Sequence, residues 1–297
     1  MVSLRCPRFG WLGAVLERAE LARWQEEAIP LAKFIASLPE LPEDHPAKQD
    51  YVWNAIKRRW AADAPTGDQS VQDSPSWALK HALDRIAALF GNEKPRWIYA
   101  PWITAVARNQ VAQFPVYRDG LSVIWAIQAL NQYGALFEGH PSIPSEAPYI
   151  WPSAVNRKSC QYKSFFSRAA QYPLAFSLPK TLEECIVLVR ECRVPVLIAS
   201  YRGFHFKPGE HKGRQIWRPC GVWPHAMCLI EYDHDLGAMY RLSSWGPNSM
   251  PPPPEGETPG GAWNLLEDLE KELSLGHAFL YVVFPRGALV ERRNPGD

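Results

Sequence analysis

The residues best suited to chemistry lie at His225 and in the segment that follows it. Residues 226–232 form a short, mostly apolar run, and residues 238–242 form a second one. The five residues between these runs include Gly237 and are typical of a β-hairpin turn. His225 would then stand at the mouth of the first strand, beside the Ser-Ser-Trp-Gly of residues 243–246. This arrangement suits an imidazole that acts as a general base and is oriented by a second polar side chain.

Six cysteines, at positions 6, 160, 185, 192, 220 and 228, are the other candidates for chemistry. Cys160 lies in Arg-Lys-Ser-Cys-Gln-Tyr, and because positive neighbours lower a thiol pKa, it is the alternative nucleophile. Cys220 and Cys228 flank His225 without the paired spacing of a zinc site. Residues 233–235, Asp-His-Asp, stand where a hairpin turn needs polar residues. We therefore predict no metal, no cofactor, and free thiols of the kind found in a reducing compartment.

Residues 225–246 resemble the histidine and asparagine half of the papain-like cysteine peptidases. In that family a His-Ala strand that continues to a Tyr is followed by a strand ending in Asn-Ser-Trp-Gly. Here the first pattern starts at His225, and Pro219-Cys220-Gly221 precedes it, as in plant members of that family. Ser243 stands where the family has the Asn that orients the imidazole, and Trp245 matches the Trp that shields this pair from water. The resemblance implies an α+β, papain-like fold of two lobes, one helical and one an antiparallel β-barrel-like lobe.

In that family the nucleophile stands in a Cys-Trp-Ala segment that opens a long buried helix, after a Gln that serves as the oxyanion donor. A helix N-terminus and a nearby imidazolium both lower a thiol pKa. Residues 119–134 resemble this helix through Trp125 and Ala126, which places Ile124 in the nucleophile position. A second register keeps Gln110 as the oxyanion residue and places Val116 there instead. Neither register supplies Cys, Ser or Thr, so the resemblance implies that the cleft chemistry has been lost.

The sequence predicts mainly helices before residue 95 and both helices and strands after it. Helical spacing covers residues 12–38, where Pro30 must break it, and residues 48–64 and 76–90. A capping box at residues 181–184 opens another helix, and a buried strand follows at residues 194–199. We predict an N-terminal helical region over residues 1–95 and a papain-like domain over residues 96–297. Its helical lobe would span about residues 96–178 and its β lobe about residues 179–297.

Composition excludes several classes of partner. The 297-residue chain has a formal net charge of +1, which gives no support for nucleic acid or an anionic membrane as partner. No apolar run is long enough to cross a bilayer, and the first apolar stretch is too short and interrupted for a signal peptide. We expect a soluble, cytoplasmic-type protein.

The combined loss of the nucleophile, the orienting Asn and the Gln with its glycines predicts a catalytically inactive papain-like protein that acts as a structural or binding module. Its former cleft would be lined by Ile124, Trp125, His225, Ser243 and Trp245. Two alternatives are an active cysteine peptidase that uses Cys160 and a regulatory pseudoenzyme subunit. Degenerate papain-like proteins of this kind resemble bacteriophage gene products. On that resemblance we hypothesise a virion or assembly component whose partners are other protein subunits.

Overall fold

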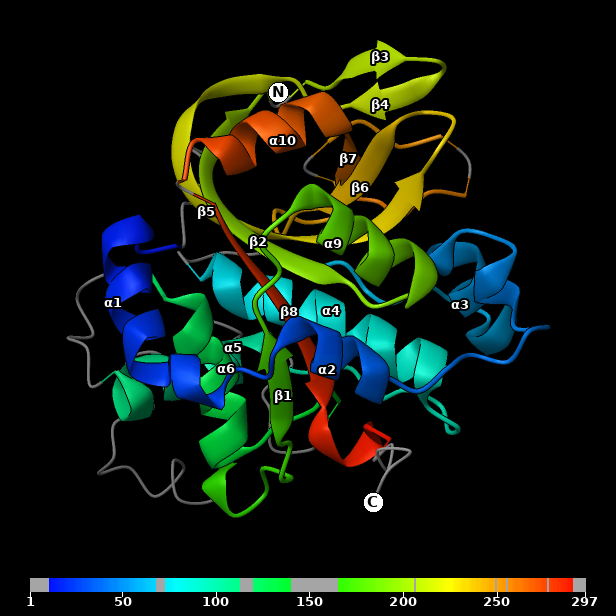
Figure 1. Cartoon of the computed structure of the whole chain (residues 1–297). Helices are drawn as coiled ribbons and strands as arrows, with labels where there is room; N and C mark the ends of the chain where they lie inside the picture. Colours follow the sequence, from blue (N-terminus) through cyan, green and yellow to red (C-terminus); the bar gives the residue numbers. More distant parts are fainter. Residues whose placement is uncertain are drawn as a thin grey trace.

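One curved sheet and one long helix organise the molecule, a computed structural model that Figure 1 shows as a ribbon. It describes residues 11–67, 73–112, 120–139 and 165–290, apart from residues 206, 249, 255 and 277. Eight strands in this part of the chain form the sheet, in the order β1-β8-β2-β5-β6-β7-β4-β3. The fold is α+β, as the sequence predicts. The sheet-rich lobe lies in the upper half of Figure 1, and the lobe that holds α4, α5 and α6 lies below it.

The described elements have the following bounds. The α-helices are α1 (Ala14–Trp24), α2 (Leu31–Ser37), α3 (Val52–Trp60), α4 (Ser74–Phe90), α5 (Ala100–Val106), α6 (Val123–Tyr133), α9 (Leu182–Ile186) and α10 (Leu266–Ser274). Short 3-10 or π turns are η1 (Gln25–Glu27), η2 (Pro46–Lys48), η3 (Ala107–Val111), η4 (Val187–Glu191) and η5 (Arg286–Ala288). The strands are β1 (Leu174–Ser177), β2 (Val196–Phe204), β3 (Gly209–His211), β4 (Arg214–Ile216), β5 (Pro219–Asp233), β6 (Ala238–Leu242), β7 (Gly261–Leu265) and β8 (Phe279–Pro285). None of the described helices combines the length and apolar character needed to cross a bilayer.

The predicted hairpin is present as β5 and β6, but β5 already begins at Pro219, so His225 lies within the strand and not at its mouth. Asp233 pairs with Ala238 at its closed end, and Gly237 has the positive φ, 63°, that such turns require. The predicted capping box is also present, because Thr181 and Glu184 each accept a backbone N–H of the other's residue. β8 lies between β1 and β2, and residues 280–284 are all buried, as expected of a strand with both faces covered.

Helix α4 is the centre of the molecule. It packs against β5, β2 and β8 on one side and against α3, α5 and α6 on the others. Nearly every side chain along it is therefore buried, including Lys80 and Asp84, which form an ion pair with each other; Lys80 also contacts Glu138 at 3.0 Å. Because α4 precedes residue 95 and yet contacts both lobes, the predicted domain boundary at that residue stays a prediction.

The segments before α4 lie along the outside of both lobes (Figure 1). α1 packs on α6, α2 packs on β1, and α3 packs on α4. Specific bonds attach them to the sheet-rich lobe: the Tyr51 hydroxyl donates to Asp233, and the Lys57 ammonium donates to the carbonyl of Gly256 at 2.8 Å. These contacts make the N-terminal helices an integral layer of the packed structure.

Helix α3 ends at Trp60, and its C-cap residue Ala61 has a left-handed φ of 62°. A side chain costs about 1 kcal/mol in this conformation, and glycine avoids that cost. We expect Ala61→Gly to raise the free energy of unfolding by about 0.5–1 kcal/mol. Urea denaturation measures the change. The neighbouring exposed Ala62, which has no positive φ, is the matched control, and Ala62→Gly should be neutral or destabilising. Equal effects of the two substitutions would contradict this account.

Candidate functional site

The helix whose first turn contacts the strand of His225 is α4. The Ser74 hydroxyl, in the first turn of α4, accepts the backbone N–H of Ala226 at 3.0 Å. The sequence matched residues 119–134 to this position, but that helix, α6, packs against α1, α4, α5 and β1. The structure therefore favours α4 over α6 as the helix that faces the histidine.

The imidazole of His225 is sealed from solvent and engages in stacking. His225 is 2% exposed, and the ring of Trp245 stacks on the imidazole with a centroid separation of 4.9 Å and an interplanar angle of 26°. Trp223 and Trp217 stack on Trp245 in turn, at 5.1 and 5.8 Å. Burial and the nearby Arg241 lower the pKa of His225 from its ordinary 6.5 to about 3. The imidazole is therefore neutral at physiological pH.

Neither ring nitrogen of His225 forms a hydrogen bond with any residue that the structure describes. Ser243, which stands in the position of the family's orienting Asn, is buried, but its hydroxyl accepts the N–H of Trp245 at 3.3 Å. The hydrogen bond expected from Ser243 to His225 is thus not formed. A serine side chain is shorter than the family's asparagine, and here its oxygen is engaged by the local turn.

No protein-family profile matches the sequence, and no curated protein matches it either. Solved structures do match. Xylellain, a cysteine protease from Xylella fastidiosa, aligns with a TM-score of 0.54 and 14% identity, over 96% of this chain and 92% of that one. A structure concerning the mite allergens Blo t 1 and Der p 1 aligns with a TM-score of 0.50 and 10% identity, over 92% of each chain.

This chain has a papain-like fold. Identities of this size support the fold alone, and the chemistry must be judged from the residues present. The papain-like arrangement places the start of a central helix beside a histidine on the facing sheet, and here these are the start of α4 and His225 on β5.

The segment at the start of α4 that matches the Cys-Trp-Ala of papain-like peptidases is Ser76-Trp77-Ala78. Sequence reasoning missed it because Trp-Ala occurs three times, at Trp60, Trp77 and Trp125. Two features could have distinguished this segment from the other two: Ser76, a hydroxyl residue directly before Trp77, and the length of the helix that contains it. Ser76 is fully buried, and its hydroxyl lies 2.9 Å from that of Thr104 on α5. Its oxygen therefore interacts with the helical lobe, and that of Ser74 interacts with the sheet.

The other predicted site residues belong to the helical lobe. Ile124 and Trp125 are buried in the first turn of α6, where the carboxylate of Glu17 accepts the N–H groups of Val123 and Ile124. Gln110 lies in η3, which packs against α5 and α6. Their role as former cleft residues stays a prediction. Val116 and Cys160 lie outside the described residues.

Three of the four described thiols do not have the properties of a nucleophile. Burial raises the pKa of Cys228 and of Cys185 to about 12, and burial with the charge of Glu191 raises that of Cys192 to about 11. These three thiols are therefore protonated at neutral pH, whereas a reactive cysteine needs a lowered pKa. Cys220 is half-buried on β5, five residues before His225. In the described residues no group of three His, Cys, Asp or Glu side chains could hold a metal ion.

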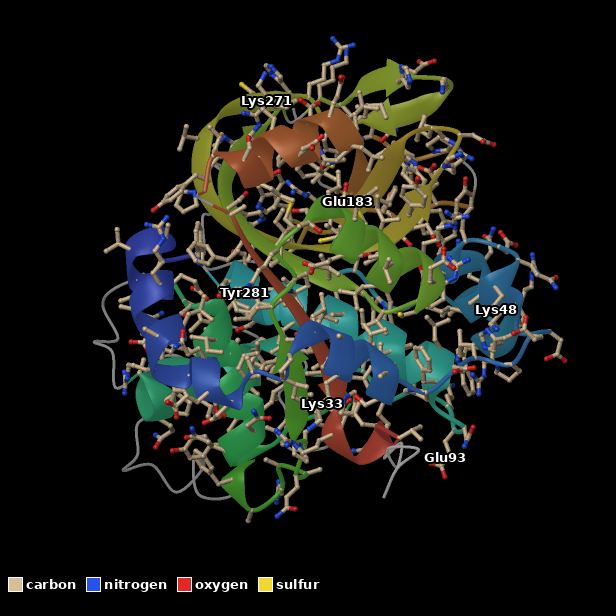
Figure 2. The ribbon with its side chains drawn as sticks, viewed as in Figure 1. Lys33, Lys48, Glu93, Glu183, Lys271 and Tyr281 are labelled. Carbon is tan, nitrogen blue, oxygen red and sulfur yellow. The ribbon has the colours of Figure 1, made fainter. Side chains whose placement is uncertain are left out.

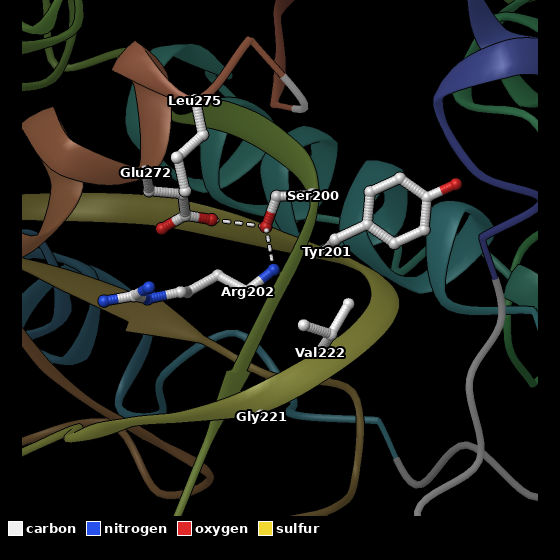
Figure 3. Close-up of a pocket in the computed structure, with 7 residues that line it drawn as sticks. All are labelled: Ser200, Tyr201, Arg202, Gly221, Val222, Glu272 and Leu275. Atoms are coloured by element: carbon white, nitrogen blue, oxygen red, sulfur yellow. Dashed lines mark hydrogen bonds between the residues drawn. The ribbon is translucent and has the colours of Figure 1, made fainter.

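A cavity of about 400 Å³ lies beside β2 and α10 (Figure 3). Ser200, the register partner of His225, donates its hydroxyl to Glu272 at the wall of this cavity. The second carboxylate oxygen of Glu272 accepts from Arg241 at 2.9 Å. Val222 and Leu275 form exposed apolar parts of its rim. Both oxygens of Glu272 are engaged, so this cavity is suited to receive an apolar group and not to transfer protons.

Proposed function

We propose that this chain is a papain-fold protein that does not hydrolyse peptides and that serves as a binding or structural module. One observation carries the proposal: the His225 imidazole is buried and neutral and forms no hydrogen bond with the described residues, beside a helix start whose hydroxyls bond to other groups. Papain-like catalysis needs a nucleophile within hydrogen-bond reach of the base and a third group that orients the base. Ser74 interacts with Ala226 and Ser76 with Thr104. In the described residues no hydroxyl or thiol bonds to the His225 imidazole and no third group orients it, which supports the proposal.

Activity measurements test this proposal. We expect the wild-type chain to show no turnover of a panel of fluorogenic peptides, because the acid–base pair is not assembled. We also expect labelling by a fluorophosphonate or an epoxide probe to be no greater than in His225→Gln. Ser76→Cys should remain inactive, because its thiol would be buried against Thr104.

Two results would overturn the proposal, and a third would overturn only the geometric observation that carries it. The first is turnover that His225→Gln abolishes. The second is His225-dependent labelling of Cys160, which would support the alternative of an active peptidase with a displaced nucleophile. The third is a gain of peptidase activity in Ser76→Cys, which would show that the site is geometrically competent.

We further propose, on the sequence resemblance, that the module's partners are protein subunits of a larger assembly, such as a virion. A regulatory role on an active relative is the alternative. Native mass spectrometry of the protein from its natural source should recover it bound to another subunit. A monomer at micromolar concentration in that preparation would contradict the assembly role.

A further inference from the structure

We propose that the cavity between η2, the end of η4 and the β5–β6 turn binds an acidic peptide segment of a partner protein. The cavity has a volume of about 280 Å³. Lys48, Arg190, Arg193 and His234 contribute cationic or titratable nitrogen atoms to its lining. This site is separate from His225 and does not depend on whether the chain hydrolyses peptides.

The carboxylates in the lining are already committed to protein donors. Glu231 is buried and accepts from the Arg193 guanidinium at 3.0 Å, from the N–H of Val52 at 2.6 Å and from its neighbour's N–H. Asp50 accepts from Asn54 at 2.9 Å and also binds Arg58. These two groups therefore stabilise the walls of the cavity, and because Arg193 pairs with Glu231 and Arg58 pairs with Asp50, Lys48 and Arg190 are the cations that can meet a ligand.

Two of the cations have only weak competitors. Lys48 pairs with Glu43, whose side chain is 94% exposed, and Arg190 pairs with Glu191, whose side chain is 63% exposed. Exposed pairs of this kind contribute little, because water screens them and both side chains lose rotamer freedom. A carboxylate on a ligand can replace these partners at small cost. Figure 2 shows Lys48 on the outer surface beside α3, where a partner can reach it.

Arg193 indicates that the floor of this cavity is held in a fixed conformation. It follows η4 with a left-handed φ of 57°, at a helix end where glycine is the favoured residue. Its side chain is 13% exposed and is anchored by Glu231. Backbone strain of this kind persists where the surrounding contacts determine it, and such positions concentrate at ligand sites.

A second pocket narrows the class of ligand. It has a volume of about 340 Å³ and shares Lys48 and Arg193 with the first. Ile35, Leu38 and Leu41 give it apolar walls. A ligand that spans both pockets would place a carboxylate beside Lys48 and an aliphatic side chain among these residues. An acidic peptide that carries Asp or Glu next to Leu, Ile or Val has this chemistry.

Isothermal titration with matched peptides tests the proposal on the full chain. The probe is acetyl-Gly-Asp-Leu-Asp-Leu-Gly-amide, and its control has Asn in place of both Asp residues. We expect the Asp peptide to bind at least tenfold more tightly and to weaken as salt is raised. Lys48→Gln/Arg190→Gln should weaken its binding at least tenfold. Arg23→Gln/Lys271→Gln removes the same charges from exposed positions on α1 and α10 and should change nothing.

The proposal is overturned if the two peptides bind equally, if neither binds, or if both double variants weaken binding to the same extent. Inorganic phosphate supplies a further arm. If inorganic phosphate displaces the bound Asp peptide at a concentration close to that peptide's own Kd, the site is a general anion site and the proposal of peptide recognition fails. Circular dichroism of each variant confirms that it is folded before titration.

Discussion

Replacing Glu17 with alanine is expected to lower the free energy of unfolding by about 4 kcal/mol, because several buried donors would lose their acceptor at once. The carboxylate is fully buried and accepts from Trp11 Nε1 at 2.9 Å, from the N–H of Val123 at 3.1 Å and from the hydroxyl of Tyr281. Figure 2 shows Tyr281 in the interior of the molecule. Glu17 thus connects α1 to the N-terminus of α6 and to β8.

The variant Glu17→Gln should cost roughly half as much. Burial raises the pKa of Glu17, so the native side chain bears a desolvation cost when it is ionised, and the neutral amide avoids it. The amide has only one acceptor oxygen, however, and its NH₂ group would meet N–H donors. Urea denaturation measures both variants, and amide hydrogen exchange should show faster exchange at Val123 and Ile124.

Glu20 gives the matched control for this prediction. It lies one turn further along α1, and its ion pair is with Arg23, whose side chain is 65% exposed. Glu20→Ala should therefore cost less than about 1 kcal/mol. If Glu17→Ala cost no more than Glu20→Ala, the hydrogen bonds at the start of α6 would not hold the N-terminal helix in place.

The parts of the fold that the sequence predicted well are those specified by short-range signals. β6 runs over Ala238–Leu242, the residues predicted, because a polar turn with a glycine separates it from β5. The helix that begins after Thr181 is also present as predicted, because its capping box is a signal carried by four neighbouring residues. β1, β3 and β4 were not predicted. They are three or four residues long, too short to show the alternation by which strands are recognised.

The site was harder to predict because long-range contacts assemble it. The bond between Ser74 and Ala226 joins residues 152 positions apart, and no local pattern shows which buried helix will meet β5. Helical spacing over residues 12–38 includes Glu17 but does not predict its burial, since a lone carboxylate in a helical pattern usually faces solvent. Its burial follows from donors 106 and 264 positions away. His225 could be proposed from the sequence because the strand and turn that follow it are recognisable from local residues.

Arg241→Met is expected to destabilise the protein by about 3–5 kcal/mol, because it would leave Glu272 charged and unpaired in the interior. Arg241 is buried, donates to Glu272 at 2.9 Å and lies over the ring of Phe204 at 4.9 Å. Arg241→Met/Glu272→Gln removes both charges and should recover at least half of the loss. Arg23→Met, at the ion pair on α1 whose arginine is exposed, should cost less than about 1 kcal/mol.

The same substitution tests the electrostatics of the imidazole. The pKa of His225 should rise above about 3 in Arg241→Met, because a nearby positive charge is removed, and stay below 6.5, because burial is the larger cause. The native protein binds fewer protons at this histidine than the unfolded chain does. The stability that neutral His225 contributes is therefore present above pH 6.5 and is lost as the pH falls toward 3.

Raising the folded-state pKa of His225 narrows the pH range between that value and the unfolded-state pKa. The free energy of unfolding that is lost on acidification because of His225 should therefore be smaller in Arg241→Met. Titration of the His225 Cε1 proton by NMR, assigned by comparison with His225→Gln, measures the pKa in each protein. An unchanged pKa would show that Arg241 does not act on the imidazole. A pKa near 6.5 in the native protein would show that the ring is solvated, and the case for a sealed, non-catalytic site would then fail with it.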